Sequence, residues 1–170
     1  PHTAYTSQVP RLFSDSLREN VALGRQLTDA EIGQALEVAV LGPDVAAMPS
    51  GLETEVGARG VRLSGGQVQR AAAARMLLRE AELLVFDDIS SALDVETERR
   101  LWDGLFSSGD VTCLVVSHRR AALERADRVI VLEEGRVAAQ GSLEEVLPVM
   151  PELGNGPRLP EPEVVERAGD

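Results

Sequence analysis

Short apolar runs alternate with helical patterns along this sequence, and this alternation constrains the fold more than any other feature. Residues 83–86 form a continuous apolar run, and residues 111–116 form a second one that only Thr112 interrupts. Such runs are typical of strands that are buried on both faces, as in a parallel sheet. Buried strands that alternate with helices predict an α/β fold with a mainly parallel sheet.

Capping boxes mark three expected helix starts. In each box a Ser or Thr precedes a Glu or Gln by three residues, so that side chains and backbone N–H groups can satisfy one another. The boxes are Thr28 with Glu31, Ser64 with Gln67, and Ser142 with Glu145. We expect the first helix to be stopped by Gly42-Pro43, and the others to end near residues 78 and 147. Asp94 is expected to cap a further helix, whose apolar side chains are Leu101, Trp102 and Leu105.

The remaining segments are shorter or less regular. Apolar patterns predict the end of a strand at 3–7, a short helix at 119–126, and a hairpin of strands 128–132 and 136–140 around a Glu-Gly turn. Residues 43–62 show turn residues without a period, which indicates a loop.

These elements predict one domain at residues 1–150 followed by a tail. No strand is expected from 12 to about 80, so this segment is interpreted as a helical subdomain attached to a core at 81–150. Residues 151–170 hold several prolines and acidic side chains with few apolar ones. Such a segment buries too little surface to offset its ordering entropy, so we expect a disordered tail.

Charge and composition exclude several classes of function. The formal net charge is −11, and all 17 basic residues are Arg, so the chain lacks the basic surface that nucleic-acid binding requires. Aromatic residues make up 3%, too few for base-stacking platforms. No apolar run approaches the ~20 residues of a membrane span. The lone Cys113 suits a reducing compartment. No signal peptide is visible. Because the sequence starts at Pro1 rather than Met and a strand-like segment follows almost at once, we expect it to be part of a longer protein.

Two adjacent carboxylates follow the first apolar strand. In open parallel sheets, ligands bind beyond the carboxyl ends of the strands, and Asp87 and Asp88 lie there. Such a pair can divide the work, one carboxylate holding Mg²⁺ through water while the other orients or deprotonates a nucleophile. The same pair is also compatible with an ordinary solvated turn.

Three further positions carry polar groups that suit a phosphate ligand. The glycines of the 64–67 segment, Ser-Gly-Gly-Gln, let backbone N–H groups approach an anion at a helix N-terminus. His118 follows the strand 111–116 and could contact a terminal phosphate. Gln8, at another strand exit, could ligate Mg²⁺ or a water molecule. Taken singly, each also fits a purely structural role.

Taken together, these residues resemble the nucleotide-binding domain of ABC transporters over about residues 3–148. The order matches the family: a Q-loop at Gln8, the signature Leu-Ser-Gly-Gly-Gln at 63–67, a Walker B strand ending at Asp87, a D-loop at 91–94 and a switch histidine at His118. The flanking sequences LFSDSLRENVALG and LETEVGARGVRLSGGQVQR resemble the exporter type. The resemblance implies a P-loop NTPase-like fold whose core, at 81–150, is RecA-like.

The resemblance also implies a mechanism. Two such domains, identical or different, would enclose two ATP molecules head to tail and couple this dimerisation to transmembrane transport. Ser64, Gly65 and Gly66, together with Gln67, would face the ATP held by the partner domain. The groups that serve the chain's own ATP would be Asp87 and Gln8 at Mg²⁺, Asp88 as the catalytic carboxylate, and His118 at the γ-phosphate. Asp94 would help couple the two sites.

The same resemblance implies where the chain works. Residues 9–24 would face the coupling helices of a membrane domain that is not present in this chain. That arrangement places the chain at the cytoplasmic face of the cell membrane.

Two departures from the family pattern affect the expected activity. The phosphate-binding loop G-x-x-x-x-G-K-[ST] is absent, because the chain has no Lys, and it would precede Pro1. We therefore expect the 170-residue chain alone to be inactive, and ATPase activity to belong to the full-length protein. The second departure is Asp88, where active members usually carry Glu. Asp is one methylene shorter, and misplacing a catalytic group by that order can cost ~10²-fold in rate.

Two alternatives remain open at this point. Asp88 is compatible with a catalytically weak, regulatory ATP-binding half of a heterodimer. A non-transport ABC-type ATPase that acts on chromosomes or in DNA repair would share the signature. Such proteins carry long coiled coils before it, whereas the segment between Gln8 and Ser64 is short and shows no sustained heptads.

Overall fold

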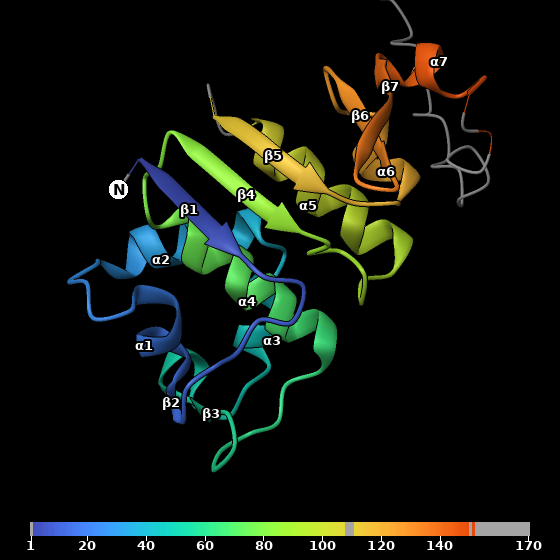
Figure 1. Ribbon diagram of the computed structural model, residues 1–170. Helices are drawn as coiled ribbons and strands as arrows, with labels where there is room; N and C mark the ends of the chain where they lie inside the picture. The colour runs from blue at the N-terminus through green and yellow to red at the C-terminus, as the bar shows by residue number, and fades with distance from the viewer. Residues whose placement is uncertain (1, 108–110, 150, 152–170) are drawn as a thin grey trace, which may run out of the picture.

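The computed structural model describes residues 2–107, 111–149 and 151, and Figure 1 shows their arrangement. Strands β1 (Thr3–Thr6), β4 (Leu83–Asp87) and β5 (Thr112–Val116) form a parallel sheet in the order β1-β4-β5. Phe86 lies opposite Thr6 on one side and Val115 on the other. The three carboxyl ends therefore meet at one edge of the sheet, and the α/β fold predicted from the sequence is confirmed.

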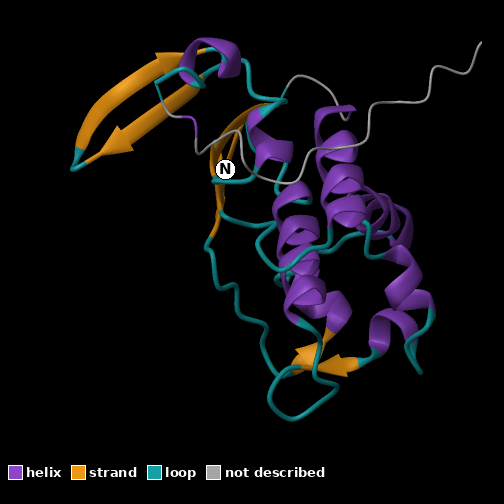
Figure 2. Cartoon of the chain, turned by 90° about the vertical axis from the view of Figure 1, so that its right-hand side faces the viewer, coloured by secondary structure: helices purple, strands orange, loops and turns teal. Residues whose placement is uncertain are grey.

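Helices cover one face of this sheet, as Figure 2 shows. Helix α4 (Gly65–Leu77) contacts β1, and α5 (Val95–Ser107) packs its Trp102 edge-on against Phe86 of β4, with ring centroids 5.8 Å apart. The buried alanines of α4, at 71–74, let this helix lie close to its neighbours. The larger hydrophobic cluster of the described residues joins this layer to the sheet and extends into residues 17–56. A second, smaller cluster contains Val129, Val131 and Val146.

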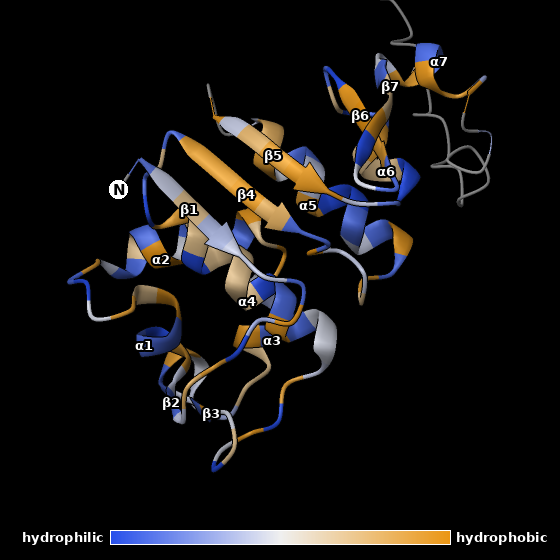
Figure 3. Ribbon diagram, viewed as in Figure 1, coloured by the Kyte–Doolittle hydropathy of each residue, from blue (hydrophilic) through white to orange (hydrophobic). Residues whose placement is uncertain are grey.

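The prediction that both apolar strands are buried on both faces is wrong for β5 and only partly met by β4, whose alternate side chains are half-buried. The alternate side chains of β5, Leu114 and Val116, are 55% and 57% exposed, and Tyr5 of β1 is 60% exposed. Tertiary packing causes this exposure. The helices that cover the sheet within the described residues all lie on its other face. Figure 3 shows β4 as a largely hydrophobic strand despite this one-sided cover.

The segment between β1 and β4 is mainly helical but departs from the prediction. It contains α1 (Leu17–Ala22), α2 (Asp29–Val38), α3 (Gly42–Ala46) and a short 3-10 helix at Gly51–Glu53. It also contains two short antiparallel strands, β2 (Asp15–Ser16) and β3 (Glu55–Val56). The expectation of no strand from 12 to 80 is therefore wrong, because two-residue strands are too short to leave a sequence period.

The predicted loop at 43–62 is wrong as well, since α3, the 3-10 helix and β3 all fall within or overlap it. Helix α2 ends at Val38, and Gly42-Pro43 does not stop it but opens α3, with Pro in the first turn. Proline is favourable at that position because its missing N–H has no intrahelical partner there. The three capping boxes are all formed as predicted.

The C-terminal part forms a hairpin of β6 (Val129–Glu133) and β7 (Arg136–Gly141), followed by α7 (Leu143–Val146). Glu134 and Gly135 both adopt positive φ at the turn, as a tight hairpin requires. Among the described residues, the hairpin shares no backbone ladder with the parallel sheet. The predicted short helix is observed as α6 (Arg120–Leu123). Except for residue 151, the predicted tail lies outside the described residues.

The structure also bears on membrane insertion. Within the described residues, no helix combines the length and apolar character that a bilayer crossing requires.

Candidate functional site

The side chain of Asp88 lies buried at the carboxyl edge of the sheet. It follows β4 directly, is 7% exposed, and adopts a φ of 48°, a left-handed conformation that strains a residue with a side chain. Its N–H donates to Val116 O at 2.8 Å, and its Oδ2 accepts from Gln8 Nε2 at 3.3 Å. Its Oδ1 is buried and has no hydrogen-bond partner among the described residues. Asp88 thus presents one unsatisfied acceptor at the place where a ligand is expected.

Asp87 lies beside it with a different partner. Its Oδ2 accepts from the hydroxyl of Tyr5 at 3.3 Å. Desolvation and then the nearby Asp87 carboxylate raise the pKa of the Tyr5 hydroxyl above its ordinary value. Sequence reasoning missed Tyr5, although its outward position on a strand parallel to β4 could have indicated it.

The oxygens at this edge fit a Mg²⁺ site only if water and substrate phosphates supply the remaining ligands. Carboxylates of Asp87 and Asp88 and the amide oxygen of Gln8 are the hard ligands that Mg²⁺ prefers. Within the described residues, no group of three or more His, Cys, Asp or Glu side chains is arranged to hold a metal ion. Mg²⁺ typically binds through one or two carboxylates, with water and substrate phosphates completing the octahedron. The buried, unpaired Oδ1 of Asp88 is compatible with that arrangement.

The 64–67 segment opens α4 as a capping box. Ser64 Oγ accepts from the Gln67 N–H at 3.2 Å, and Gln67 Oε1 accepts from the Ser64 N–H at 2.8 Å. The side chain of Gln67 also donates to Asp44 Oδ1 at 2.8 Å, which holds it in place. The N–H groups of Gly65 and Gly66 make no hydrogen bond within the described part of the chain. They remain available to an external acceptor at the positive end of the helix.

The start of α4 approaches the loop that follows Asp88. A Cβ on Gly66 would lie 3.0 Å from Ala92 O and 3.1 Å from Leu93 Cδ2, so only glycine fits without a shift. Asp94 ends this loop and caps α5, accepting from the Thr97 N–H at 3.0 Å and from Thr97 Oγ1 at 2.7 Å. These two hydrogen bonds lower the pKa of the Asp94 carboxyl. The capping role predicted for Asp94 is confirmed.

His118 is exposed on the segment after β5. Because Asp87 lies opposite Val116 in the parallel ladder, His118 belongs to the same edge of the sheet as the two carboxylates. The predicted residues therefore fall into two groups. Gln8, Asp87, Asp88 and His118 gather at the sheet edge. Residues 64–67 lie at the start of α4, and no hydrogen bond within the described residues joins the two groups directly.

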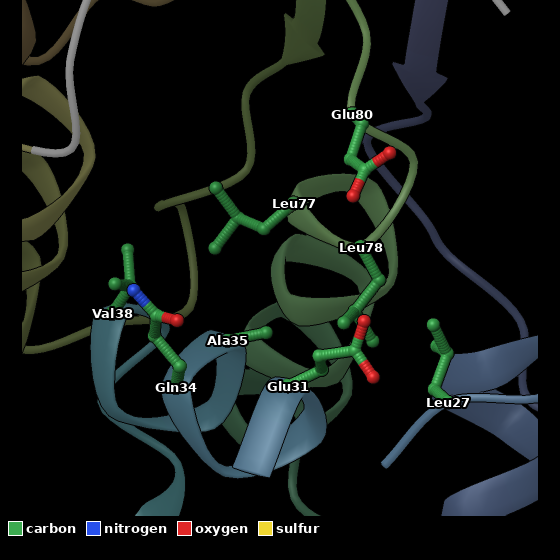
Figure 4. A pocket seen from close by; sticks show the side chains of 8 residues that line it. All are labelled: Leu27, Glu31, Gln34, Ala35, Val38, Leu77, Leu78 and Glu80. Atoms are coloured by element: carbon green, nitrogen blue, oxygen red, sulfur yellow. The ribbon is translucent and has the colours of Figure 1, made fainter.

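A cavity of about 240 Å³ between α2 and α4 lies apart from these residues (Figure 4). Its walls are apolar side chains, and its polar side chains are Glu31, Gln34 and Glu80. Glu31 is already used by its capping box, where hydrogen bonds from Thr28 lower the pKa of its carboxyl. No predicted site residue and no basic side chain lines this cavity, and its two carboxylates would repel a phosphate.

Known proteins are similar in sequence to most of this chain. No protein-family model matches it. It is 47% identical over 146 residues to an ATP-dependent lipid A-core flippase of Burkholderia orbicola, an alignment that covers 85% of this chain and 24% of the flippase. It is 43% identical over 148 residues to ABC transporter B family member 1 of Arabidopsis thaliana, covering 86% of this chain and 12% of that protein.

The structure resembles a bacterial Atm1-family ABC exporter solved with ATP bound. The TM-score is 0.82 at 35% sequence identity, and the match covers 88% of this chain and 27% of that chain. The chain thus spans about a quarter of the length of the flippase it matches. Its homologues are ABC exporters, and its α/β fold agrees with part of a P-loop NTPase-like domain.

Proposed function

We propose that this chain is the C-terminal part of the nucleotide-binding domain of an ABC exporter, from the Q-loop onward. In the full-length protein it would bind and hydrolyse ATP and couple that cycle to transport. The observation that carries the proposal is the buried, unpartnered Oδ1 of Asp88, held beside Gln8 at the sheet edge. The similarity to ABC exporters over most of the chain supports the same assignment.

Each site residue then has a role set by its position. Asp87 and Gln8 would hold Mg²⁺, which neutralises phosphate charge when bound. Asp88 Oδ1 would accept a hydrogen bond from the attacking water and orient it. His118 would donate to the terminal phosphate.

The helix start at 64–66 would face the ATP of a partner domain, with Gln67 holding the turn and Asp94 coupling the two sites. The exposed His118 at the carboxyl edge of the sheet supports these roles. So do the N–H groups of Gly65 and Gly66, which make no hydrogen bond within the described residues.

Uncovered surfaces support the view that other segments complete this domain. Within the described residues, β5 and the β6-β7 hairpin each have an unpaired edge. The outer face of the sheet exposes Tyr5, Leu114 and Val116. We propose that a preceding segment, which brings the lysine-bearing phosphate loop, covers these surfaces and completes the RecA-like core at 81–150, while 12–80 forms the helical subdomain.

A membrane domain is the second expected partner. Val9 and Phe13, in the segment 9–24, are 75% and 62% exposed and would meet its coupling helices. This contact would hold the chain at the cytoplasmic face of the membrane.

Purified proteins test the proposal directly. We expect the full-length protein to hydrolyse ATP only with Mg²⁺, and the 170-residue chain to show no hydrolysis above background, because it has no Lys to contact the phosphates. Phosphate release measured with and without EDTA checks both. Absence of ATP hydrolysis in the full-length protein would contradict the proposed function. Hydrolysis by the chain alone would contradict the assigned need for a preceding segment.

Because Asp88 stands where active family members usually carry Glu, variants at this position test whether the protein pairs with itself or with a different subunit. If the protein pairs with a different subunit, Asp88 lies in the slower site, and Asp88→Glu should raise turnover only modestly. Ser64→Arg should then lower turnover more than Asp88→Asn does, because it blocks the faster site. If two copies of this protein pair, Asp88→Glu should raise turnover ~10-fold or more by placing the carboxylate better.

We expect the heterodimer. Mass spectrometry of the purified complex identifies its subunits. Asp127→Glu, at an exposed residue outside the proposed site, serves as a control for one added methylene. A complex with a single kind of subunit that Asp88→Glu activates strongly would contradict this expectation.

A further inference from the structure

Loop 90–94, which follows the carboxylate pair, is held on one side by a side chain of α4. Gln69 is 5% exposed; its Nε2 donates to Ser91 Oγ at 2.8 Å, and its Oε1 accepts from the Ala92 N–H at 3.0 Å. The nitrogen and the oxygen of one side-chain amide thus both hydrogen-bond to adjacent loop residues. Because Gln69 lies one turn beyond Gly65 and Gly66, these contacts fix the loop relative to the start of α4.

Arg119 holds the same loop from the other side. Its Nη1 donates to Leu93 O at 3.2 Å, and its Nη2 donates to Ser91 O at 3.4 Å. The planar guanidinium presents donors at fixed angles and so can hold several acceptors at once. Since Arg119 directly follows His118 in the chain, these contacts join the loop to the segment that carries His118.

A buried carboxylate anchors Arg119. Glu98 of α5 is 3% exposed; its Oε2 accepts from Arg119 Nη1 at 2.8 Å, and its Oε1 accepts from the buried Ser90 hydroxyl at 2.6 Å. A buried ion pair contributes little net stability compared with a well-packed apolar pair, because desolvation offsets the attraction. What this pair supplies is geometry: Ser90, Glu98 and Arg119 fix both ends of the loop relative to α5.

We infer that Gln69 and Arg119 are positioning residues that clamp loop 90–94 between the start of α4 and the His118 segment, so that the three move as one body. The inference rests on the proposed function, in which the start of α4 meets one ATP and His118 meets the other. The clamp then transmits a displacement at one ATP site to the second site through a single chain. Gln69 connects loop 90–94 to α4, and Arg119 connects it to the segment that carries His118.

Kinetics of the full-length protein test the clamp. Arg119→Lys keeps the charge opposite Glu98, but its donors lie on a single nitrogen and cannot occupy the two separate Nη positions that Arg119 uses. We expect kcat for ATP hydrolysis to fall ~10-fold or more through misplacement of His118, with KM changed less than about twofold and the Hill coefficient for ATP lowered toward about 1. Gln69→Leu, of similar volume, should do the same. The double variant should be no worse than the more affected single one, because both changes release the same loop.

Hydrogen exchange separates positioning from general loosening. In Arg119→Lys we expect faster exchange at both 90–94 and 117–120, with the melting temperature within about 2 °C of the wild type. The matched control is Arg99→Ala on α5, the helix that carries Glu98. The ion pairs of Arg99 with Glu96 and Asp103 are exposed. This variant should leave kcat, the Hill coefficient and exchange in both segments unchanged, because exposed pairs contribute ~0–1 kcal/mol.

The outcomes distinguish this inference from the proposed function. An active wild type whose Arg119→Lys variant keeps kcat and the Hill coefficient overturns the clamp and leaves the proposed function standing. A fall in kcat with a matching loss of melting temperature also overturns it, since Arg119 would then act on stability alone. A wild type without ATP hydrolysis overturns the proposed function itself.

Discussion

Asp87→Asn is expected to lower the ATP turnover of the full-length protein ~10²-fold or more, because it removes the charge that positions a divalent cation. The change keeps the size of the side chain, and the amide can still accept the hydrogen bond from Tyr5. The backbone of β4 is held by its ladders to β1 and β5 and should not shift. Steady-state ATP hydrolysis at saturating Mg²⁺ measures the effect, which should also appear as a weaker dependence of rate on Mg²⁺.

Glu82→Gln is the matched control for Asp87→Asn. Glu82 is an exposed carboxylate that precedes the opposite end of β4, where it contacts His2. The same loss of one charge there should leave turnover unchanged. Wild-type turnover in Asp87→Asn, or an equal loss in Glu82→Gln, would contradict the role of the sheet edge.

Trp102→Ala is expected to have the largest effect on stability. Trp102 is fully buried, contacts Phe86 edge-on at 5.8 Å, and stacks on Phe106 at 6.0 Å between ring centroids. Truncating a buried aromatic side chain to Ala typically costs ~3–5 kcal/mol, from lost burial and the cavity left behind. Urea denaturation of the chain, followed by far-UV circular dichroism, measures the free energy of unfolding. Fluorescence is unsuitable because Trp102 is the only tryptophan.

Two other variants test this explanation. Phe106 is 42% exposed, so Phe106→Ala should cost clearly less than Trp102→Ala. Trp102→Phe should also cost less, because the buried indole Nε1 has no hydrogen-bond partner among the described residues and its loss leaves no acceptor unpaired. Equal destabilisation by Phe106→Ala and Trp102→Ala would show that burial against β4 is not the cause.

Features encoded over three or four residues were predictable from the sequence. The capping boxes at Thr28, Ser64 and Ser142 formed because each needs only a side chain and a backbone group one turn apart. The Glu134-Gly135 hairpin followed from local turn chemistry in the same way. The prediction of a loop at 43–62 was wrong because the elements there are two to five residues long and leave no measurable period.

The burial of the strands depended on neighbours that the pattern does not specify. An apolar run predicts that a strand is stabilised by burial, but tertiary packing decides whether both of its faces are buried. Leu114 and Val116 are apolar and exposed because the helices of the described residues pack on the opposite face.

The sequence alone determined which polar groups stand at strand ends and helix starts, since Asp87, Asp88 and His118 follow apolar runs and Ser64 precedes a helical pattern. The tertiary structure decided which of them meet. Gln8 reaches Asp88 across 80 residues, Gln69 reaches Ser91 across 22, and Arg119 reaches Glu98 across 21. No local periodicity encodes contacts of that range. They arise because parallel strands bring distant chain segments to one edge, and because helix packing then sets the distances between the side chains there.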